Sequence, residues 1–302
     1  MQHLLGIEDL SADDIRNILD RAAYYAKALE GGKWDHKTLD DKIIITLFFE
    51  PSTRTLISFD IAAKRLGANV VNWQVENSAM RKDESFLDTI LTLNQMRPDA
   101  IIIRHVEFGA PNFVATRVDC PVINGGDSWR EHPTQALLDA LTMEREIGKL
   151  EDLTVAICGD VAHSRVANSN AILLKKMGAN VRIVAPEFLM PEKFAVEGLE
   201  TFTSLEEGLP GADAVMLLRI QKERMEAGQI PDDAAYHNEF GLTLEQLNLA
   251  GPKAFVMHPG PMNRGVEISD ELAEDPERSL IARQVANGIP TRMAVLDMLI
   301  GG

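Results

Sequence analysis

Four consecutive residues with hydroxyl and guanidinium side chains, Ser52-Thr53-Arg54-Thr55, come shortly after the apolar run 43–49. If that run is a strand, these residues begin the next helix, with Ser52 at its cap and the N–H groups of the first turn directed outward. Such N–H groups, together with the helix dipole, bind phosphate. The segment therefore predicts a phosphate site. An ordinary serine cap beside a solvent-exposed arginine is the alternative.

Further polar side chains follow apolar runs in the same half of the chain. Arg104 closes the run 100–103, and His132 and Gln135 flank Pro133. Pro133 suits the first turn of a helix, which leaves His132 at the cap and Gln135 in that turn. Ligands of open α/β sheets bind beyond the carboxyl ends of strands, so these side chains are candidates for the same site. The alternatives are that Arg104 only marks the point where the strand reaches solvent, and that His132 has a structural role.

A second group of basic and polar side chains follows the apolar runs of the second half. Its members are Arg165, Arg219, Gln221, Lys222, Arg224, His258, Arg264 and Glu267. Arginine binds carboxylates through paired hydrogen bonds, so this half predicts a site for a substrate with carboxylates. Salt bridges between domains are the alternative for some of these side chains.

The polar segment 77–84 lies between a predicted strand and a predicted helix. Its composition favours a solvated surface loop. The alternative is an arm that delivers Ser78 and Lys82 to an anion.

Short apolar runs that alternate with helical patterns must position these residues. The predicted strands are 43–49, 68–73, 100–104, 121–124, 153–158, 180–184, 214–218 and 254–257. Predicted helices separate them, near 53–66, 85–97, 110–117, 133–147, 164–177, 191–196, 204–208 and 243–249. This alternation predicts an α/β protein with two doubly wound parallel-sheet domains.

We expect the first domain to contain residues 1–147 and a C-terminal helix, 285–302, and the second to contain residues 148–284. The active site is then expected in the cleft between the domains, where strands of both present their carboxyl ends. Gly288 and Pro290 predict a break between two helices in the last segment.

The composition is that of an acidic globular protein. The chain has 302 residues, 45% of them apolar, and a formal net charge of −16. An acidic surface repels nucleic acid and anionic membranes, so an anionic substrate needs a local cluster of basic side chains. No apolar run approaches the ~20 residues that span a bilayer, and the N-terminus lacks a secretory pattern. Cys120 and Cys158 predict buried thiols, and we expect a cytoplasmic protein.

Four motifs together resemble those of the aspartate/ornithine carbamoyltransferase family, in the same order and over essentially the whole chain. They are Ser52-Thr53-Arg54-Thr55, His132-Pro133-Thr134-Gln135, Arg219-Ile220-Gln221-Lys222-Glu223-Arg224 and His258-Pro259-Gly260-Pro261. The resemblance implies transfer of the carbamoyl group of carbamoyl phosphate to an amino acid, without cofactor or metal. Ornithine-specific relatives have a cysteine where this chain has Thr134 and Gly260. The resemblance therefore favours L-aspartate as acceptor, which gives N-carbamoyl-L-aspartate for pyrimidine biosynthesis.

The resemblance also implies roles for individual residues. Those that bind carbamoyl phosphate are Ser52, Thr53, Arg54, Thr55, Arg104, His132 and Gln135, with Ser78 and Lys82 from a neighbouring subunit. Among these, the implied catalytic residues are Arg54, Thr55, Arg104 and His132. Those that bind aspartate are Arg165, Arg219, Gln221 and Lys82. Backbone contacts come from Pro259, Gly260 and Pro261, and Glu50 is the implied partner of Arg165 and Arg224 in a closed form.

A homotrimer with shared active sites is the implied minimal assembly, either alone or with regulatory chains or a dihydroorotase. Two residues depart from the family pattern, Trp129 and Asp83. Asp83 places an acid beside Lys82, which weakens the assignment of that lysine as an anion ligand.

Three other functions compete with this interpretation. A carbamoyltransferase for ornithine or another amino acid would share most of the motifs. A catalytically silent homologue that serves assembly would have lost Arg54, Arg104 or His132, all of which are present. A nicotinamide-dependent dehydrogenase would need a glycine-rich turn, which the segment 158–162 lacks.

Overall fold

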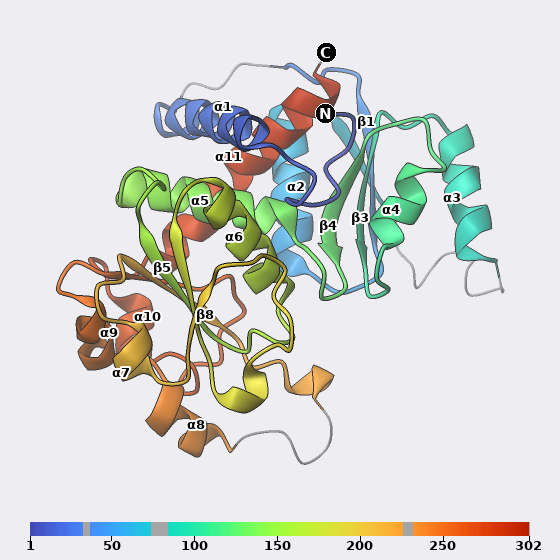
Figure 1. The fold of residues 1–302 in the computed structure, drawn as a ribbon. Helices are drawn as coiled ribbons and strands as arrows, with labels where there is room; N and C mark the ends of the chain where they lie inside the picture. The colour runs from blue at the N-terminus through green and yellow to red at the C-terminus, as the bar shows by residue number, and fades with distance from the viewer. Residues whose placement is uncertain (33–36, 74–83, 226–231, 302) are drawn as a thin grey trace. The chain divides into compact units, whose positions relative to one another are not determined.

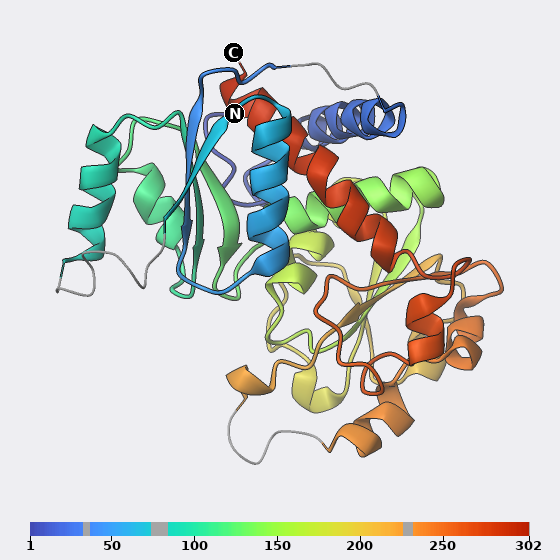
Figure 2. The ribbon, with the colours of Figure 1, turned by 180° about the vertical axis from the view of Figure 1, so that it is seen from behind.

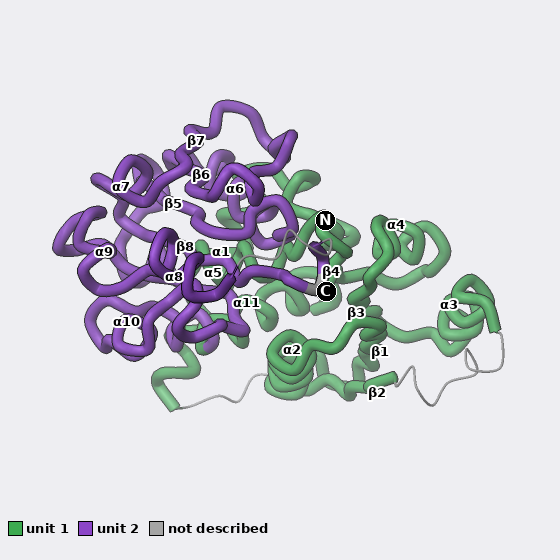
Figure 3. The backbone as a smooth tube through the Cα atoms, turned by 90° about the horizontal axis from the view of Figure 1, so that it is seen from below, with its two compact units in different colours: residues 1–141, 286–302 green, residues 142–285 purple. Residues whose placement is uncertain are grey.

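Two compact units make up the computed structural model, which describes residues 1–32, 37–73, 84–225 and 232–301. Unit 1 consists of residues 1–141 and 286–302, and unit 2 consists of residues 142–285 (Figure 3). Unit 1 therefore contains both the first and the last part of the chain. Each unit contains one parallel sheet, as the sequence predicted.

The predicted strands of the first half form the sheet of unit 1, in the order β2-β1-β3-β4. Their bounds are β1 Ile43–Phe48, β2 Asn69–Trp73, β3 Ala100–His105 and β4 Val122–Asp127. All residues of β3 and β4 are buried. The outer side of β4 is covered by the N-terminal segment, because Leu4 N donates to Val122 O (2.9 Å) and Leu4 O accepts from Asn124 N (2.8 Å). Since the strands are parallel, their carboxyl ends share one edge of the sheet.

Helices cover both faces of this sheet (Figures 1 and 2). The helices α3 (Phe86–Gln95) and α4 (Ala110–Ala115) lie on one face, and α2 (Thr53–Arg65) lies on the other. Apolar side chains fill the space between the sheet and α3 and α4, among them Leu47, Ile90, Ile101, Ile103, Val114 and Val122. This packing fixes the ends of β1 and β3, where the candidate residues follow.

The first helix, α1 (Ala12–Glu30), is absent from the sequence prediction. Its start carries a recognisable signal, a capping box in which Ser11 accepts from Asp14 N and the Asp14 carboxylate accepts from Ser11 N. The pattern Ser-x-x-Asp before an apolar periodicity would have revealed this helix.

The last helix, α11 (Ile281–Ile300), is continuous, so the predicted break at Gly288 and Pro290 is wrong. Pro290 has no N–H to donate within the helix. Beside it, the Thr291 hydroxyl donates to the carbonyl four residues earlier (2.8 Å), and Arg292 Nη1 donates to the Gly288 carbonyl (3.0 Å). These bonds satisfy carbonyl oxygens near the proline, and the four residues that follow Arg292 are fully buried, so the helix continues.

Unit 2 has a five-stranded parallel sheet in the order β7-β6-β5-β8-β9. The strands are β5 Thr154–Gly159, β6 Asn180–Val184, β7 Glu200–Phe202, β8 Ala214–Leu218 and β9 Phe255–Met257. The helices of this unit are α6 Arg165–Lys176, α7 Leu205–Gly208, α8 Asp233–Phe240, α9 Leu244–Ala250 and α10 Asp270–Glu274, together with short 3-10 turns at Glu187–Leu189 and Lys222–Arg224. The helix α5 (Pro133–Glu146) connects the two units along the chain.

The predicted helix at 191–196 is wrong. Residues 191–199 form bends and irregular backbone, and the short strand β7 follows them. The side chains of 191–199 are exposed or half-buried, so a helix there would have no apolar face to bury. The nearest fully buried side chain is Leu189, in the preceding 3-10 turn.

In the part of the chain that the structure describes, no helix combines the length and the hydropathy that crossing a membrane requires. Cys120 and Cys158 are buried free thiols, as predicted. Burial raises the pKa of the Cys120 thiol to about 11, so the unreactive thiol form dominates at neutral pH.

Candidate active site

The predicted phosphate turn begins α2 at the carboxyl end of β1. Ser52 occupies the N-cap position, and its carbonyl accepts from Leu56 N (3.2 Å). The Ser52 side chain makes no capping hydrogen bond to the first-turn N–H groups, although its backbone is extended, as at other N-caps (φ −158°, ψ 95°). The serine side chain therefore does not occupy the donors that a phosphate would need.

The side chains of this turn differ in their exposure. Thr53 and Arg54 are exposed, whereas Thr55 is buried. The Thr55 hydroxyl lies 3.4 Å from Nε2 of His132. Two residues that lie 77 positions apart are thus brought together at one edge of the sheet.

Arg104 lies in the same region and is buried, so it is not a solvent boundary. Its Nη2 lies 2.5 Å from Oε1 of Glu50, and its Nη1 is 3.4 Å from the Gly125 carbonyl oxygen. The guanidinium therefore sits at the ends of β1, β3 and β4 and already binds a carboxylate.

His132 and Gln135 lie at the start of α5, which begins at Pro133 as predicted. His132 is buried, and its carbonyl accepts from Gln135 N (2.9 Å). The carboxamide of Gln135 donates to Oδ1 of Asp139, one turn further along α5 (2.9 Å). Asp139 was not among the predicted site residues.

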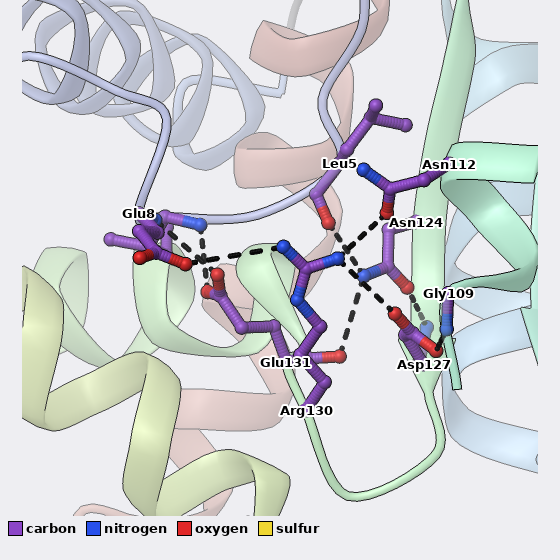
Figure 4. Close-up of polar contacts among 10 residues, drawn as sticks. Leu5, Glu8, Gly109, Asn112, Asn124, Asp127, Arg130 and Glu131 are labelled. Atoms are coloured by element: carbon purple, nitrogen blue, oxygen red, sulfur yellow. Dashed lines mark hydrogen bonds and ion pairs between the residues drawn. The ribbon is translucent and has the colours of Figure 1, made fainter. Parts of the chain in front are cut away.

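Glu131, which precedes His132, anchors the turn before α5 to the N-terminal segment (Figure 4). Its buried carboxylate accepts from the N–H groups of Ile7 (2.7 Å) and Glu8 (3.3 Å). On the opposite side, the Asn124 carboxamide donates to the Leu5 carbonyl (2.8 Å) and is 3.4 Å from the Glu131 carbonyl. The backbone that carries His132 is therefore held by residues 5–8 and by β4.

Trp129 lies in the same turn, between β4 and α5. It is 56% exposed, and its ring lies 5.7 Å from that of Phe108, which is also exposed. This departure from the family pattern therefore falls on the surface.

Gly6 fits closely against Glu131, and we predict that Gly6→Ala destabilises unit 1. A Cβ at position 6 would lie 2.3 Å from Oε1 of Glu131, so the carboxylate must leave the N–H groups that it accepts from. Overpacking of this kind costs about 1–3 kcal/mol in the free energy of unfolding, which urea titration measures. Gly31→Ala is the matched control, because its nearest neighbour atom would be at 3.5 Å. Equal stability of the two variants would contradict the prediction.

In unit 2, the segments that follow β5 and β8 are joined by Asp160. This fully buried carboxylate accepts from Gln221 N (2.9 Å) and lies 2.7 Å from Nδ1 of His163. The His163 carbonyl in turn accepts from the side chains of Gln221 (2.7 Å) and Arg224 (2.8 Å). Sequence reasoning placed Gln221 and Arg224 after a strand but missed Asp160 and His163, which hold them.

The two arginines that the resemblance implies for aspartate binding follow strands, as the sequence analysis expected. Arg165 is the first residue of α6 and is buried, and Arg219 directly follows β8 and is half-buried. Basic side chains therefore come after two adjacent strands of the sheet, where the carboxyl ends of β5 and β8 meet.

The turn after β9 is fixed by His258. Its Nδ1 accepts from Gly260 N (2.8 Å), so Nε2 carries the ring proton and donates to Oε1 of Glu267 (3.2 Å). The same Glu267 oxygen accepts from Asn263 N (2.6 Å). His258 is thus a buried residue that shapes the turn 259–261 through both ring nitrogens.

Two predicted residues, Ser78 and Lys82, lie outside the described residues, as does Asp83. Within the described ranges, no group of three or more His, Cys, Asp or Glu side chains is arranged to hold a metal ion.

Comparison with known families accounts for both halves of the chain. Residues 2–145 match the carbamoyl-P binding domain of aspartate/ornithine carbamoyltransferase, and residues 151–299 match the Asp/Orn binding domain. The chain belongs to the aspartate/ornithine carbamoyltransferase family.

Members of this carbamoyltransferase family resemble the chain over almost its full length. The aspartate carbamoyltransferase catalytic subunit of Dinoroseobacter shibae is 52% identical over 298 residues, which cover 99% of this chain and 94% of that protein. The aspartate transcarbamoylase of Trypanosoma cruzi in complex with N-(phosphonacetyl)-L-aspartic acid superposes with a TM-score of 0.87 at 31% identity, over 98% of this chain and 94% of that one. The ornithine carbamoyltransferase of Pyrococcus furiosus superposes with a TM-score of 0.89 at 28% identity, over 100% of this chain and 97% of that one.

Proposed function

We propose that this chain is the catalytic chain of an aspartate carbamoyltransferase. It transfers the carbamoyl group of carbamoyl phosphate to the α-amino group of L-aspartate and gives N-carbamoyl-L-aspartate and phosphate. The observation that carries this proposal is the grouping of Thr55, Arg104 and His132 beside the N-terminus of α2. The 52% identity to a named aspartate carbamoyltransferase catalytic subunit supports the choice of acceptor.

Unit 1 supplies the carbamoyl phosphate site in this proposal. The phosphate binds to the first turn of α2, with the hydroxyl groups of Ser52, Thr53 and Thr55 and the exposed guanidinium of Arg54. The carbonyl oxygen binds near Thr55, Arg104 and His132, and the carbamoyl amide binds to Gln135. In support of this role, Nη2 of Arg104 binds one carboxylate oxygen of Glu50 in this structure.

Unit 2 supplies the aspartate site. Arg165 and Arg219 bind the carboxylates of aspartate, and Gln221 provides its carboxamide oxygen, because its nitrogen is bonded to the His163 carbonyl. The backbone of Pro259, Gly260 and Pro261, shaped by His258, completes the contacts. Since the bound substrates must meet, the reaction requires residues of both units.

The chemistry follows from where charge develops. The deprotonated α-amino group of aspartate attacks the carbamoyl carbon, and negative charge grows on the carbonyl oxygen. Preorganised donors from Thr55, Arg104 and His132 stabilise that charge. Phosphate then leaves into the pocket of Arg54, and one of its oxygen atoms takes the amino proton, so no separate base is required. Orientation of two anions that otherwise repel each other supplies much of the rate.

The proposal includes a homotrimer in the cytoplasm, with Ser78 and Lys82 reaching the active site of the neighbouring subunit. We predict that mixing Lys82→Ala with Arg54→Ala trimers, after dissociation and reassociation, restores part of the activity. A hybrid trimer contains some sites in which both residues are wild type, whereas neither parent trimer has any. Activity of the mixture is compared with that of each variant reassociated alone. No recovery, with subunit exchange demonstrated by differently tagged chains, would contradict shared sites.

The proposed function is tested by incubating the purified chain with carbamoyl phosphate and either L-aspartate or L-ornithine. We expect carbamoylaspartate and no citrulline. Citrulline formation would assign the chain to the ornithine branch of the family. No product from either acceptor, with carbamoyl phosphate bound, would point to another acceptor, and absence of carbamoyl phosphate binding would overturn the proposal.

A further inference from the structure

The Gln135 side chain has a fixed orientation. Its carboxamide nitrogen lies 2.9 Å from Oδ1 of Asp139, a residue with no exposed surface. An ionised carboxylate only accepts hydrogen bonds, so the NH₂ group of Gln135 must face Asp139. Within the described residues, the Gln135 side chain makes no other hydrogen bond. Its oxygen is therefore on the side away from Asp139 and is left as an acceptor.

The charge of Asp139 has a partner in α11. A buried carboxylate without compensation tends to become protonated, and it could then donate to the amide oxygen instead. Arg292 is also buried, and its positive charge opposes protonation of Asp139. Burial lowers the pKa of Arg292, while the negative charge of Asp139 raises it and the positive charge of Arg104 lowers it. The attraction between Arg292 and Asp139 is mutual, so it also favours the ionised carboxylate.

Arg292 is itself held in place. Its Nη1 donates to the Gly288 carbonyl (3.0 Å), and its guanidinium carbon lies 5.0 Å from the centre of the Phe59 ring. The last helix of the chain thus supplies a fixed positive charge behind Asp139.

We propose that Asp139 is a positioning residue that fixes the Gln135 carboxamide with its oxygen toward the carbamoyl group. This inference rests on the proposed carbamoyl phosphate site. The carbamoyl NH₂ group is a donor, and the fixed Gln135 oxygen is the matching acceptor. An acyl phosphate with a methyl group in place of NH₂ leaves that acceptor unpaired, so it is rejected. Asp139 therefore sets the preference of the site for carbamoyl phosphate over acetyl phosphate.

The test is Asp139→Asn, which keeps the size of the side chain and removes the charge. An asparagine can donate to or accept from Gln135, so the carboxamide is free to turn over. Dissociation constants for carbamoyl phosphate, acetyl phosphate and inorganic phosphate are measured by calorimetry on the assembled protein. We expect the preference for carbamoyl phosphate over acetyl phosphate to fall by about 10-fold or more, with the phosphate affinity within about twofold of wild type.

Two further variants separate positioning from general damage. Asp139→Asn in a Gln135→Ala background should cause no additional loss of preference, because the residue through which Asp139 acts is absent. Asp297→Asn, which removes another buried carboxylate of unit 1 in an ion pair with Arg21, should leave the preference unchanged. If Asp139→Asn does not fold, Asp139→Asn with Arg292→Met removes both buried charges and allows the same measurement.

An unchanged preference in a folded Asp139→Asn variant would overturn the inference. Equal weakening of carbamoyl phosphate, acetyl phosphate and phosphate would overturn it too, because that result indicates a structural role. Failure of the proposed function is distinguishable, since the wild-type chain would then not prefer carbamoyl phosphate at all.

Discussion

Replacing Arg54 with alanine is expected to lower kcat/KM for carbamoyl phosphate by about 100- to 1000-fold. The leaving phosphate gains negative charge in the transition state, and Arg54 lies in the helix turn where that charge is received. The side chain is exposed, and substitutions at exposed positions usually change stability by less than about 0.5 kcal/mol. Steady-state kinetics, with thermal unfolding alongside, therefore separates a catalytic effect from unfolding.

Arg65→Ala is the control for this experiment. Arg65 is also exposed but ends α2, at the opposite end of the helix from the phosphate turn. It should keep wild-type activity. Near-normal activity of Arg54→Ala would contradict a phosphate site in this turn. Loss of activity in both variants would indicate that the electrostatics of the whole helix had been disturbed.

Replacing Arg104 with methionine is expected to reduce kcat by about 100- to 1000-fold, the usual effect of deleting one donor that stabilises an oxyanion. The methionine keeps much of the apolar volume and removes every donor. Because charge on the carbonyl oxygen grows only in the transition state, the loss should appear mainly in kcat, with a smaller change in KM. Product formation measured over a range of carbamoyl phosphate concentrations gives both constants.

Arg104 also binds Glu50, so the substitution breaks an ion pair. Arg21→Met is the control, since it breaks another arginine–carboxylate pair of unit 1, the one with Asp297. We expect the two variants to have similar stability, and only Arg104→Met to lose kcat. If the two variants had the same kcat, Arg104 would have a structural role and no role in the reaction.

The strands and the residues that follow them were predictable because the parallel strands are short and almost continuously apolar. Arg104 could be placed at a strand end and Arg165 beyond the turn after a strand from this pattern alone, and the structure has Arg104 near the end of β3 and Arg165 as the first residue of α6, after β5. Their burial could not be predicted, because it depends on segments distant in sequence. Glu131 is an example: its carboxylate is satisfied by N–H groups more than 120 positions away.

The errors have equally specific causes. Pro290 correctly indicates a missing donor, but the side chains of Thr291 and Arg292 compensate for it within the same helix. Ser52 occupies the cap position that its residue type favours, but its side chain makes no capping bond. Asp139 was missed although its spacing of four residues from Gln135 places both on one face of α5, which is a signal that the sequence does contain.

The arrangement of unit 1, with residues 286–302 returning to it, has a consequence for synthesis on the ribosome. The 144 residues from 142 to 285 are made before that last segment, which takes about 7–30 s at roughly 5–20 residues per second. During this interval, Asp139 has no Arg292 beside it, and the apolar surface that receives Met293 and Leu296 is uncovered. Unit 1, most of which is made before unit 2, therefore completes its native packing only after unit 2 has been made. The nascent chain is most prone to aggregation, and most in need of chaperones, in that window.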